Sequence, residues 1–181
     1  VLISNYRGIR RIYGKNKISA RMDKYKFLVS SESFFQVNTI EATSMYNYIK
    51  SLIEKTNVIF DLYCGTGTIG IFIHDKADKL IGLEINADAI KDANENKKIN
   101  NIENIEFFES DASNIIQKTN LKPSIIIVDP PRNGLSDKMI DDINKLEPEK
   151  IVYVSCDPMT LARDIKKLNK YDVINIKGFD M

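Results

Sequence analysis

The chain has 181 residues, of which 43% are hydrophobic and 28% charged, and its formal net charge is +1. This size and composition are those of one soluble globular domain. No apolar run approaches the roughly 20 residues that cross a bilayer, and nothing at the start reads as a signal peptide, so we expect a cytoplasmic protein. Two cysteines and one histidine exclude a disulfide framework and a four-thiolate metal site, and we expect no metal in this chain.

Charge is unevenly distributed along the chain. Residues 1–30 hold eight basic residues against one acidic residue, so this segment carries +7 and leaves −6 for the remainder. A basic arm of this kind fits contact with an RNA phosphate backbone. A solvated hairpin with lysines on its open face explains the charge equally well.

The first predicted element is a short β-hairpin segment. Gly14 and Asn16 stand between two short runs that contain apolar residues, which is the pattern of a hairpin turn. A helix follows, capped by Asn38 or Thr39, and its apolar face extends to Ile53.

From residue 58 onward, apolar runs alternate with helical segments. The six predicted strands cover 58–63, 79–84, 105–110, 124–130, 150–156 and 172–178, and the helices between them lie at about 67–74, 89–100, 136–146 and 159–168. Apolar strands separated by helices predict a mostly parallel sheet with helices on both faces. In such sheets ligands bind beyond the carboxyl ends of the strands.

The turn after the first of these strands has the residues of a cofactor site. Gly65 and Gly67 permit positive φ and let a ligand approach the backbone, and the acidic Asp61 precedes them. The dinucleotide fingerprint GxGxxG is absent, because Gly70 lies inside the helix. The pattern favours the methionine part of S-adenosylmethionine, with a tight turn that binds nothing as the alternative.

Two acidic residues follow the next two strands. Glu84 stands 17 residues after Gly67, where a carboxylate can accept both ribose hydroxyls of an adenosine. Asp111 is placed to meet the adenine amino group, and a helix N-cap is an equal alternative. With the glycine turn, these residues predict an α/β fold of the Rossmann-like, S-adenosylmethionine-dependent methyltransferase type.

The fourth and fifth strands end in residues suited to chemistry. Two prolines after Asp129 stiffen the loop, and Arg132 stands where amino-methyltransferases place an aromatic residue, which leaves it free for a phosphate. Cys156 precedes a helix whose dipole stabilises a thiolate, so we favour a nucleophile over a packing role. Cys64 lies within the cofactor turn, and we interpret it as structural.

Aromatic and amide side chains stand just before the first long helix. Phe34, Phe35 and Gln36 could stack on a base or on the cofactor and hydrogen-bond to it. A hydrophobic latch under the helix is the alternative for either phenylalanine, although it suits Gln36 poorly.

Together these motifs resemble the RNA uracil-5-methyltransferase family, which acts on 23S ribosomal RNA or tRNA. The resemblance covers nearly the whole chain and rests on SSESFFQVN, FDLYCGTGTIG, LIGLEIN, VDPPRNGL and YVSCDPMTLARD. The family's usual sequence has asparagine where Asp157 stands, a change that we do not expect to abolish activity.

The resemblance implies an enzyme that methylates C5 of a uridine in RNA through an adduct between Cys156 and C6 of the uracil. It implies 23S ribosomal RNA as the first expected substrate and tRNA as the alternative, with Gln36, Tyr63, Glu84 and Asp129 as cofactor contacts. The complete set of predicted cofactor residues is Gln36, Tyr63, Gly65, Gly67, Glu84, Asp111 and Asp129, with Phe35 and Arg132 predicted for the substrate.

The resemblance also implies that this chain is a fragment. Residues 1–35 would be the C-terminal remnant of a central β-rich domain, and residues 36–181 a methyltransferase domain that stops before its final strands. The family's general base, a glutamate, would lie beyond Met181, so we expect this fragment alone to be inactive. Some members carry an iron–sulfur cluster, which we would expect only in the region before this chain.

Other functions predict different residues or results. An RNA 5-methylcytosine methyltransferase normally has a second cysteine where Arg132 stands, and an amino-methyltransferase would not need Cys156. An NAD-dependent oxidoreductase requires the GxGxxG fingerprint. A non-catalytic RNA-binding module would keep its RNA affinity after loss of both Glu84 and Cys156.

Overall fold

The computed structural model describes residues 2–5, 8–11, 17–31 and 33–181. No helix in these ranges has the length and apolar character to span a membrane. The predicted turn at Gly14 and Asn16 lies outside the described residues.

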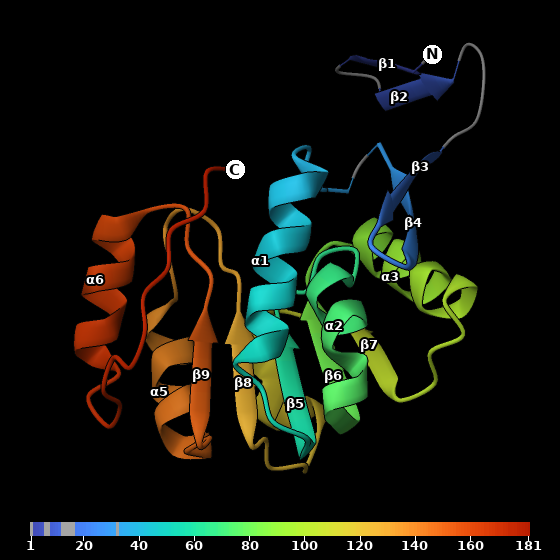
Figure 1. The fold of residues 1–181 in the computed structure, drawn as a ribbon. Helices are drawn as coiled ribbons and strands as arrows, with labels where there is room; N and C mark the ends of the chain where they lie inside the picture. The colour runs from blue at the N-terminus through green and yellow to red at the C-terminus, as the bar shows by residue number, and fades with distance from the viewer. Residues whose placement is uncertain (1, 6–7, 12–16, 32) are drawn as a thin grey trace.

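The centre of the molecule is a five-stranded sheet whose strands all run parallel (Figure 1). The strands are β5 (Thr56–Leu62), β6 (Ala77–Glu84), β7 (Ile105–Glu109), β8 (Ile125–Val128) and β9 (Lys150–Tyr153). Their spatial order is β7-β6-β5-β8-β9. The chain adds β6 and β7 on one side of β5, and then returns to add β8 and β9 on the other side. This topological switch point is where open α/β sheets bind ligands. The parallel sheet predicted from the sequence is confirmed.

Helices cover both faces of the sheet, because alternate residues of each strand point to opposite sides. The helices are α1 (Thr39–Ser51), α2 (Thr68–Ile73), α3 (Ala87–Ile99), α4 (Ile115–Lys118), α5 (Asp137–Leu146) and α6 (Pro158–Lys167), with single turns η1 (His74–Lys76) and η2 (Ala112–Asn114). On one face, Ile59 of β5 packs in a core with α1, α2 and α3. On the other, Phe60 packs in a core with α4 and α5.

The register of the sheet places the carboxyl ends of four strands at one edge. Leu62 pairs with Leu83 on one side and with Val128 on the other, and Val128 pairs with Tyr153. The residues that follow these strand ends are therefore brought together, although up to about 90 positions separate them in sequence.

Two antiparallel hairpins precede the sheet. One pairs β1 (Leu2–Asn5) with β2 (Gly8–Arg11), and the other pairs β3 (Lys17–Met22) with β4 (Tyr25–Ser30). The β-hairpin segment predicted before the sheet is confirmed, but its position differs from the predicted one. The strands on either side of residues 12–16, β2 and β3, pair with β1 and β4 and not with each other. The physical reason is the tight turn at Asp23, whose positive φ of 52° closes β3 directly onto β4.

Helix α3 covers the free edge of β4 with side chains instead of a strand. The backbone amides of Lys26, Leu28 and Ser30 donate hydrogen bonds to Asn100, Asn96 and Asp92, at 3.0, 2.7 and 2.7 Å. Four helical residues rise about 6 Å and two strand residues about 6.7 Å, so the two repeats nearly match. We call Asp92, Asn96 and Asn100 the polar ladder. Holding the edge of β4 through this ladder is the structural role of the asparagine-rich helix.

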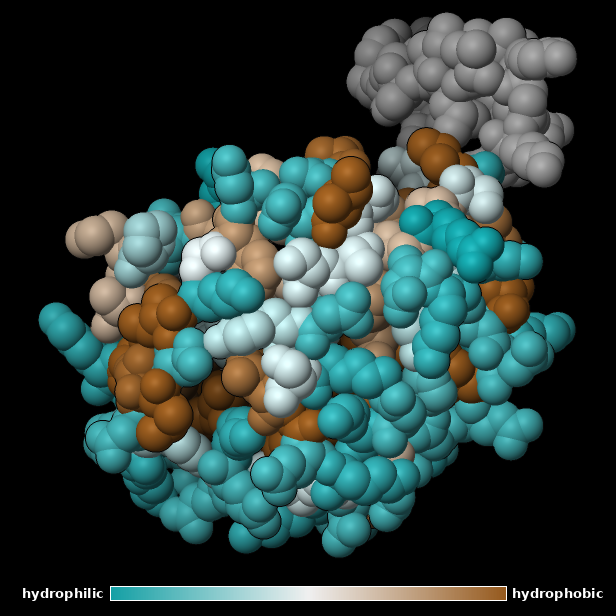
Figure 2. All heavy atoms as spheres, in the orientation of Figure 1, coloured by the Kyte–Doolittle hydropathy of each residue, from teal (hydrophilic) through white to brown (hydrophobic). Residues whose placement is uncertain are grey.

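The predicted strand at 172–178 is wrong, since the structure has no helix or strand after Lys167. A strand needs a hydrogen-bonded neighbour, and no sheet pairing includes this segment. Its residues Val173, Ile174 and Ile176 are exposed, and Figure 2 shows a hydrophobic patch on the side where this segment runs beside α6. Near its end, Phe179 contacts Tyr48 of α1 with ring centroids 5.8 Å apart.

Candidate active site

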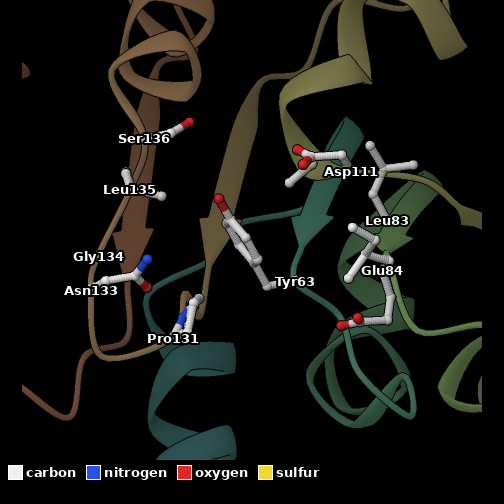
Figure 3. Close-up of a pocket in the computed structure, with 11 residues that line it drawn as sticks. Tyr63, Leu83, Glu84, Asp111, Pro131, Asn133, Gly134, Leu135 and Ser136 are labelled. Carbon is white, nitrogen blue, oxygen red and sulfur yellow. The ribbon is translucent and has the colours of Figure 1, made fainter.

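A cavity of about 200 Å³ lies at the carboxyl edge of the sheet. Its walls come from the turn after β5, the ends of β6 and β7, and the loop after β8. The lining residues are Tyr63, Leu83, Glu84, Ile85, Asp111, Ala112, Pro131, Asn133, Gly134, Leu135 and Ser136. Figure 3 shows the Tyr63 ring between two walls, with Pro131 and residues 133–136 on one side and Leu83, Glu84 and Asp111 on the other.

Tyr63 begins the glycine turn with a strained backbone. Its φ is 65°, in the left-handed region that non-glycine residues rarely adopt. Burial raises the pKa of its hydroxyl to about 12, and the carboxylates of Asp111, Asp164 and Glu84 add to the effect. The phenol therefore stays protonated at neutral pH and is available as a hydrogen-bond donor.

The two glycines predicted for the cofactor both have positive φ, 52° at Gly65 and 79° at Gly67. Their surroundings differ. A Cβ on Gly67 would lie 2.7 Å from Cζ of Phe107, whereas a Cβ on Gly65 would have no neighbour within 4 Å. Gly67 is therefore required for packing, and Gly65 leaves open space beside the backbone for a ligand.

Glu84 and Asp111 both line the cavity, and both also hold backbone groups. Glu84 accepts from the amide of Gly65 at 3.2 Å and from the amide of Asn86 at 2.8 Å, so it fixes the glycine turn to the start of α3. Asp111 accepts from the amide of Ser113 at 2.8 Å, which makes it the N-cap of η2, and hydrogen bonds from Ser113 lower its pKa. The helix-cap alternative for Asp111 is thus realised, and its carboxylate still faces the cavity (Figure 3).

The site concentrates negative charge. Asp61 is fully buried, and its pKa is raised to about 7 by burial and by the carboxylates of Asp129 and Glu84. Burial also raises the pKa of Asp129 to about 6. Among the described residues, Asp61, Glu84 and Asp129 form no ion pair, and Oδ1 of Asp61 has no hydrogen-bond partner. One buried carboxylate, Asp61, and two half-buried ones without a cation fit a ligand that brings positive charge.

Cys156 is exposed and lies at the same edge of the sheet, three residues after β9. Asp157 caps α6 by accepting from the amides of Met159 and Thr160 at 2.8 and 2.9 Å. An asparagine oxygen would make the same two bonds, which supports our expectation that aspartate at this position does not abolish activity. The thiol thus stands just before the positive end of a 10-residue helix.

Cys64 has the opposite environment. It is buried in the core against α2, and burial raises the pKa of its thiol well above the ordinary value. An inert, protonated thiol agrees with the structural role inferred from the sequence.

The two aromatic residues before α1, Phe34 and Phe35, lie in different environments. Phe35 is half-buried and packs on Phe27 with ring centroids 5.9 Å apart, whereas Phe34 is 76% exposed. Gln36 is half-buried, and Arg132 is exposed on the loop after β8. The ring open to a base is therefore that of Phe34, and the latch alternative describes Phe35.

The basic N-terminal segment is partly neutralised within the fold. Lys17 forms ion pairs with Asp92, at 2.7 Å, and with Glu95, both on α3. Nε of Arg21 donates to the backbone carbonyl of Asp23 at 3.1 Å. Lys17 is thus engaged by α3, while Arg7 and Lys15 lie outside the described residues.

Part of the cavity wall has no counterpart among the predicted residues. Asn133, Leu135 and Ser136 line the cavity, but the sequence prediction stopped at Arg132. The sequence signal that could have indicated this wall was Gly134, a glycine soon after the stiff proline pair. In the structure its φ is 74°. Two charged residues of α6, Arg163 and Asp164, hold this wall and were also missed.

Comparison with known proteins agrees with this geometry. A family model described as tRNA (Uracil-5-)-methyltransferase matches residues 9–180. An uncharacterised RNA methyltransferase of Clostridium tetani is 41% identical, with 94% of this chain and 38% of the relative aligned. One of Caldanaerobacter subterraneus is 40% identical, with 94% and 39% aligned. The chain thus spans about two fifths of the length of these relatives.

Solved structures show the same similarity. The tRNA (uracil-54, C5)-methyltransferase of Pyrococcus abyssi, solved in complex with S-adenosyl-L-homocysteine, has a TM-score of 0.80 and 36% identity over 90% of this chain and 40% of its own. Trm5b of Pyrococcus abyssi, at 16% identity and a TM-score of 0.66 over 90% of this chain and 48% of its own, shares the fold. From the family match and these relatives, the chain belongs to the tRNA (uracil-5-)-methyltransferase family.

Proposed function

We propose that the protein containing this chain uses S-adenosylmethionine to methylate C5 of a uridine in RNA. The observation that carries the proposal is the exposed Cys156, ahead of α6 and at the edge of the sheet that also holds the acidic cavity. A nucleophilic thiol is needed for methylation at C5 of uracil and has no role in methylation of an exocyclic amine.

The residues present fit S-adenosylmethionine, which carries a sulfonium and an ammonium group against one carboxylate. The carboxylates of Asp61 and Asp129, which form no ion pair with any residue that the structure describes, suit this excess of positive charge. Glu84 and Asp111, which line the cavity, would hold the ribose and adenine, with Tyr63 against the adenosine. Gly65 and Gly67 would lie beside the methionine part. A structure of a relative with S-adenosyl-L-homocysteine supports this assignment.

The chemistry follows from the weak nucleophilicity of C5 in uracil. The bound cofactor supplies an electrophilic methyl group. The Cys156 thiolate would add to C6, and the π electron pair of the C5–C6 bond would attack the methyl group and displace S-adenosyl-L-homocysteine. A general base would then take the C5 proton, so that the S–C6 bond breaks and the thiolate leaves. Gln36 and Asp129 would hold the polar edge of the uracil. The target uridine must leave its stack to reach Cys156.

Two RNA substrates are proposed. The first is 23S ribosomal RNA, as expected from the sequence. The second is tRNA, which is supported by the similarity to the tRNA (uracil-54, C5)-methyltransferase of Pyrococcus abyssi. Transfer of labelled methyl groups by the full-length protein to each RNA, followed by nucleoside analysis, decides between them.

The decisive experiment uses the full-length protein, S-adenosylmethionine and RNA that contains 5-fluorouridine. Fluorine cannot leave C5 as a proton does, so the reaction should stop at a covalent protein–RNA adduct, mapped by mass spectrometry to Cys156. Cys64→Ala is the matched control and should still form the adduct, whereas Cys156→Ser should not. Methylation of ordinary RNA without any adduct would contradict the proposal and favour cytosine or an exocyclic amine as target.

A further inference from the structure

Asp164 of α6 is a buried carboxylate outside the predicted site. Its exposed fraction is 0%, and three donors converge on it. Oδ2 accepts from the backbone amide of Leu135 at 2.7 Å and from the hydroxyl of Tyr153 at 2.8 Å, and Oδ1 accepts from Nε of Arg163 at 2.8 Å. A carboxylate is acceptor-only, so it satisfies all three donors at once.

Arg163 extends this contact to the loop after β8. One terminal nitrogen, Nη2, lies 2.7 Å from Oδ1 of Asp164 and donates to the backbone carbonyl of Asn133 at 2.8 Å and to that of Leu135 at 3.5 Å. The guanidinium and the carboxylate together therefore hold two carbonyls and one amide of residues 133–135.

The loop approaches this pair so closely that only glycine fits between them. A Cβ on Gly134 would lie 2.4 Å from Oδ2 of Asp164 and 2.6 Å from Nη2 of Arg163. The φ of Gly134 is 74°, which also favours glycine. The contact is thus specific for the backbone of this loop.

The clamped loop is one wall of the cavity, opposite Glu84 and Asp111 (Figure 3). The helix that holds it starts immediately after Cys156 and its capping neighbour Asp157. A rigid helix therefore connects the position of the thiol to the position of the cofactor wall.

We propose that Arg163 and Asp164 are positioning residues, which hold residues 133–135 at the distance that closes the cavity around the adenosine of the cofactor. The proposal rests on the proposed use of S-adenosylmethionine. Beyond that function, the proposal states that cofactor binding requires Arg163 and Asp164 of α6 to clamp a loop that lies some 30 residues earlier in the sequence. Neither residue is expected to contact the cofactor.

The test variant is Arg163→Lys in the full-length protein. Arg163 is 45% exposed, so lysine is tolerated and keeps the charge, but a single ammonium cannot bridge the carboxylate and the loop carbonyls as a planar fork does. The matched control is Lys167→Ala, which removes the 2.5 Å ion pair between α6 and Asp137 of α5 and leaves the loop contacts intact.

The measurement is the Kd of S-adenosyl-L-homocysteine by calorimetry, with urea unfolding of each variant alongside. We expect Arg163→Lys to raise the Kd about tenfold, because small displacements of positioning groups are costly, and Lys167→Ala to leave it within about twofold. A Kd unchanged in Arg163→Lys would overturn the inference. If the wild-type protein binds no S-adenosyl-L-homocysteine, the proposed function itself fails.

A double-mutant cycle separates positioning from general destabilisation. Gly134→Ala should disturb the same wall from the loop side, so its effect on the Kd and that of Arg163→Lys should be strongly non-additive. Additive effects, or a Kd that follows only the loss of stability across all variants, would show that α6 supports the fold without positioning the loop.

Discussion

At the scale of single residues, the two glycines of the turn after β5 have similar backbones and different surroundings. An alanine at either position costs about 1–2 kcal/mol for the left-handed conformation. Only at Gly67 does the new methyl group also collide with Phe107. The side of the turn at Gly65 is open, and that is where a ligand would lie.

We expect Gly65→Ala to weaken the binding of S-adenosyl-L-homocysteine at least about tenfold while lowering the free energy of unfolding by only about 1–2 kcal/mol. Gly67→Ala should lower the free energy of unfolding further, by about 3 kcal/mol or more, because overpacking adds to the backbone cost. Calorimetry and urea titration of both variants measure the two effects. The reverse order of stabilities would contradict this account of the turn.

Asp61 shows a conflict between stability and binding at one residue. Its pKa in the folded protein is about 7, well above the 3.8 of a free aspartate. A raised pKa means that its contribution to stability is complete below the unfolded value and is lost as pH rises through 7. The charged form is destabilising in the ligand-free protein, and a cationic ligand would relieve this.

We therefore expect Asp61→Asn to raise the free energy of unfolding of the ligand-free protein at pH 8, by an amount of the order of 1–4 kcal/mol. The gain should shrink toward pH 5, where the wild-type carboxyl is protonated. Urea unfolding at the two pH values measures this. An equal gain at both would show that Asp61 is not titrating between them.

The pH dependence of binding tests the same carboxylates from the ligand side. S-adenosylmethionine carries one positive charge more than S-adenosyl-L-homocysteine, so the neutral product is its matched control. Between pH 5 and 7.5, Asp129 and Asp61 lose protons in the ligand-free protein, and the affinity for S-adenosylmethionine should rise more than that for the product. A ratio of the two Kd values that stays constant over this range would contradict the electrostatic fit.

At the scale of elements, α3 connects the hairpin to the glycine turn. Asn96 is fully buried, accepts from the amide of Leu28 at 2.7 Å and donates to the carbonyl of Thr66 at 3.1 Å. A single amide side chain thus joins β4 and the turn that would bind the methionine part. Asn100 is half-buried, and it makes comparable bonds to Lys26 that are exposed to solvent.

We expect Asn96→Ala to lower the free energy of unfolding by about 2–4 kcal/mol, because it leaves the part-buried amide of Leu28 and the buried carbonyl of Thr66 without this partner. The half-buried counterpart Asn100→Ala should cost less than about 1 kcal/mol, since its bonds to Lys26 are exposed and water replaces them. Urea unfolding compares the two. Similar costs would show that burial of the ladder does not determine its strength.

At the scale of the whole molecule, the hairpin β3–β4 and the sheet share one core. Met22, Tyr25 and Phe27 are buried together with residues of α1 and α2. The division of the chain into domains between residues 35 and 36 remains our prediction. The shared core indicates that the stability of residues 36–181 depends on the hairpin before them.

A protein that starts at residue 36 should consequently be less stable than one that starts at residue 17. Loss of the three buried side chains of the hairpin removes on the order of 5 kcal/mol of hydrophobic stabilisation and uncovers part of α1 and α2. Thermal unfolding and the aggregation of both proteins measure this. A melting temperature that does not depend on the hairpin would identify residues 36–181 as an independent folding unit.

Local patterns in the sequence determined the layered sheet, the order of its elements, the glycine turn, the acidic strand ends and the family. These features depend on residues close together in the chain, and the parallel strands carry their end residues to one edge. The tertiary structure alone decided which of Phe34 and Phe35 faces outward, that Lys17 pairs with α3, and that the 172–178 segment forms no strand. It also decided that Arg163 and Asp164 clamp a loop some 30 residues earlier, because such contacts depend on how helices and loops pack, and no local pattern encodes that distance.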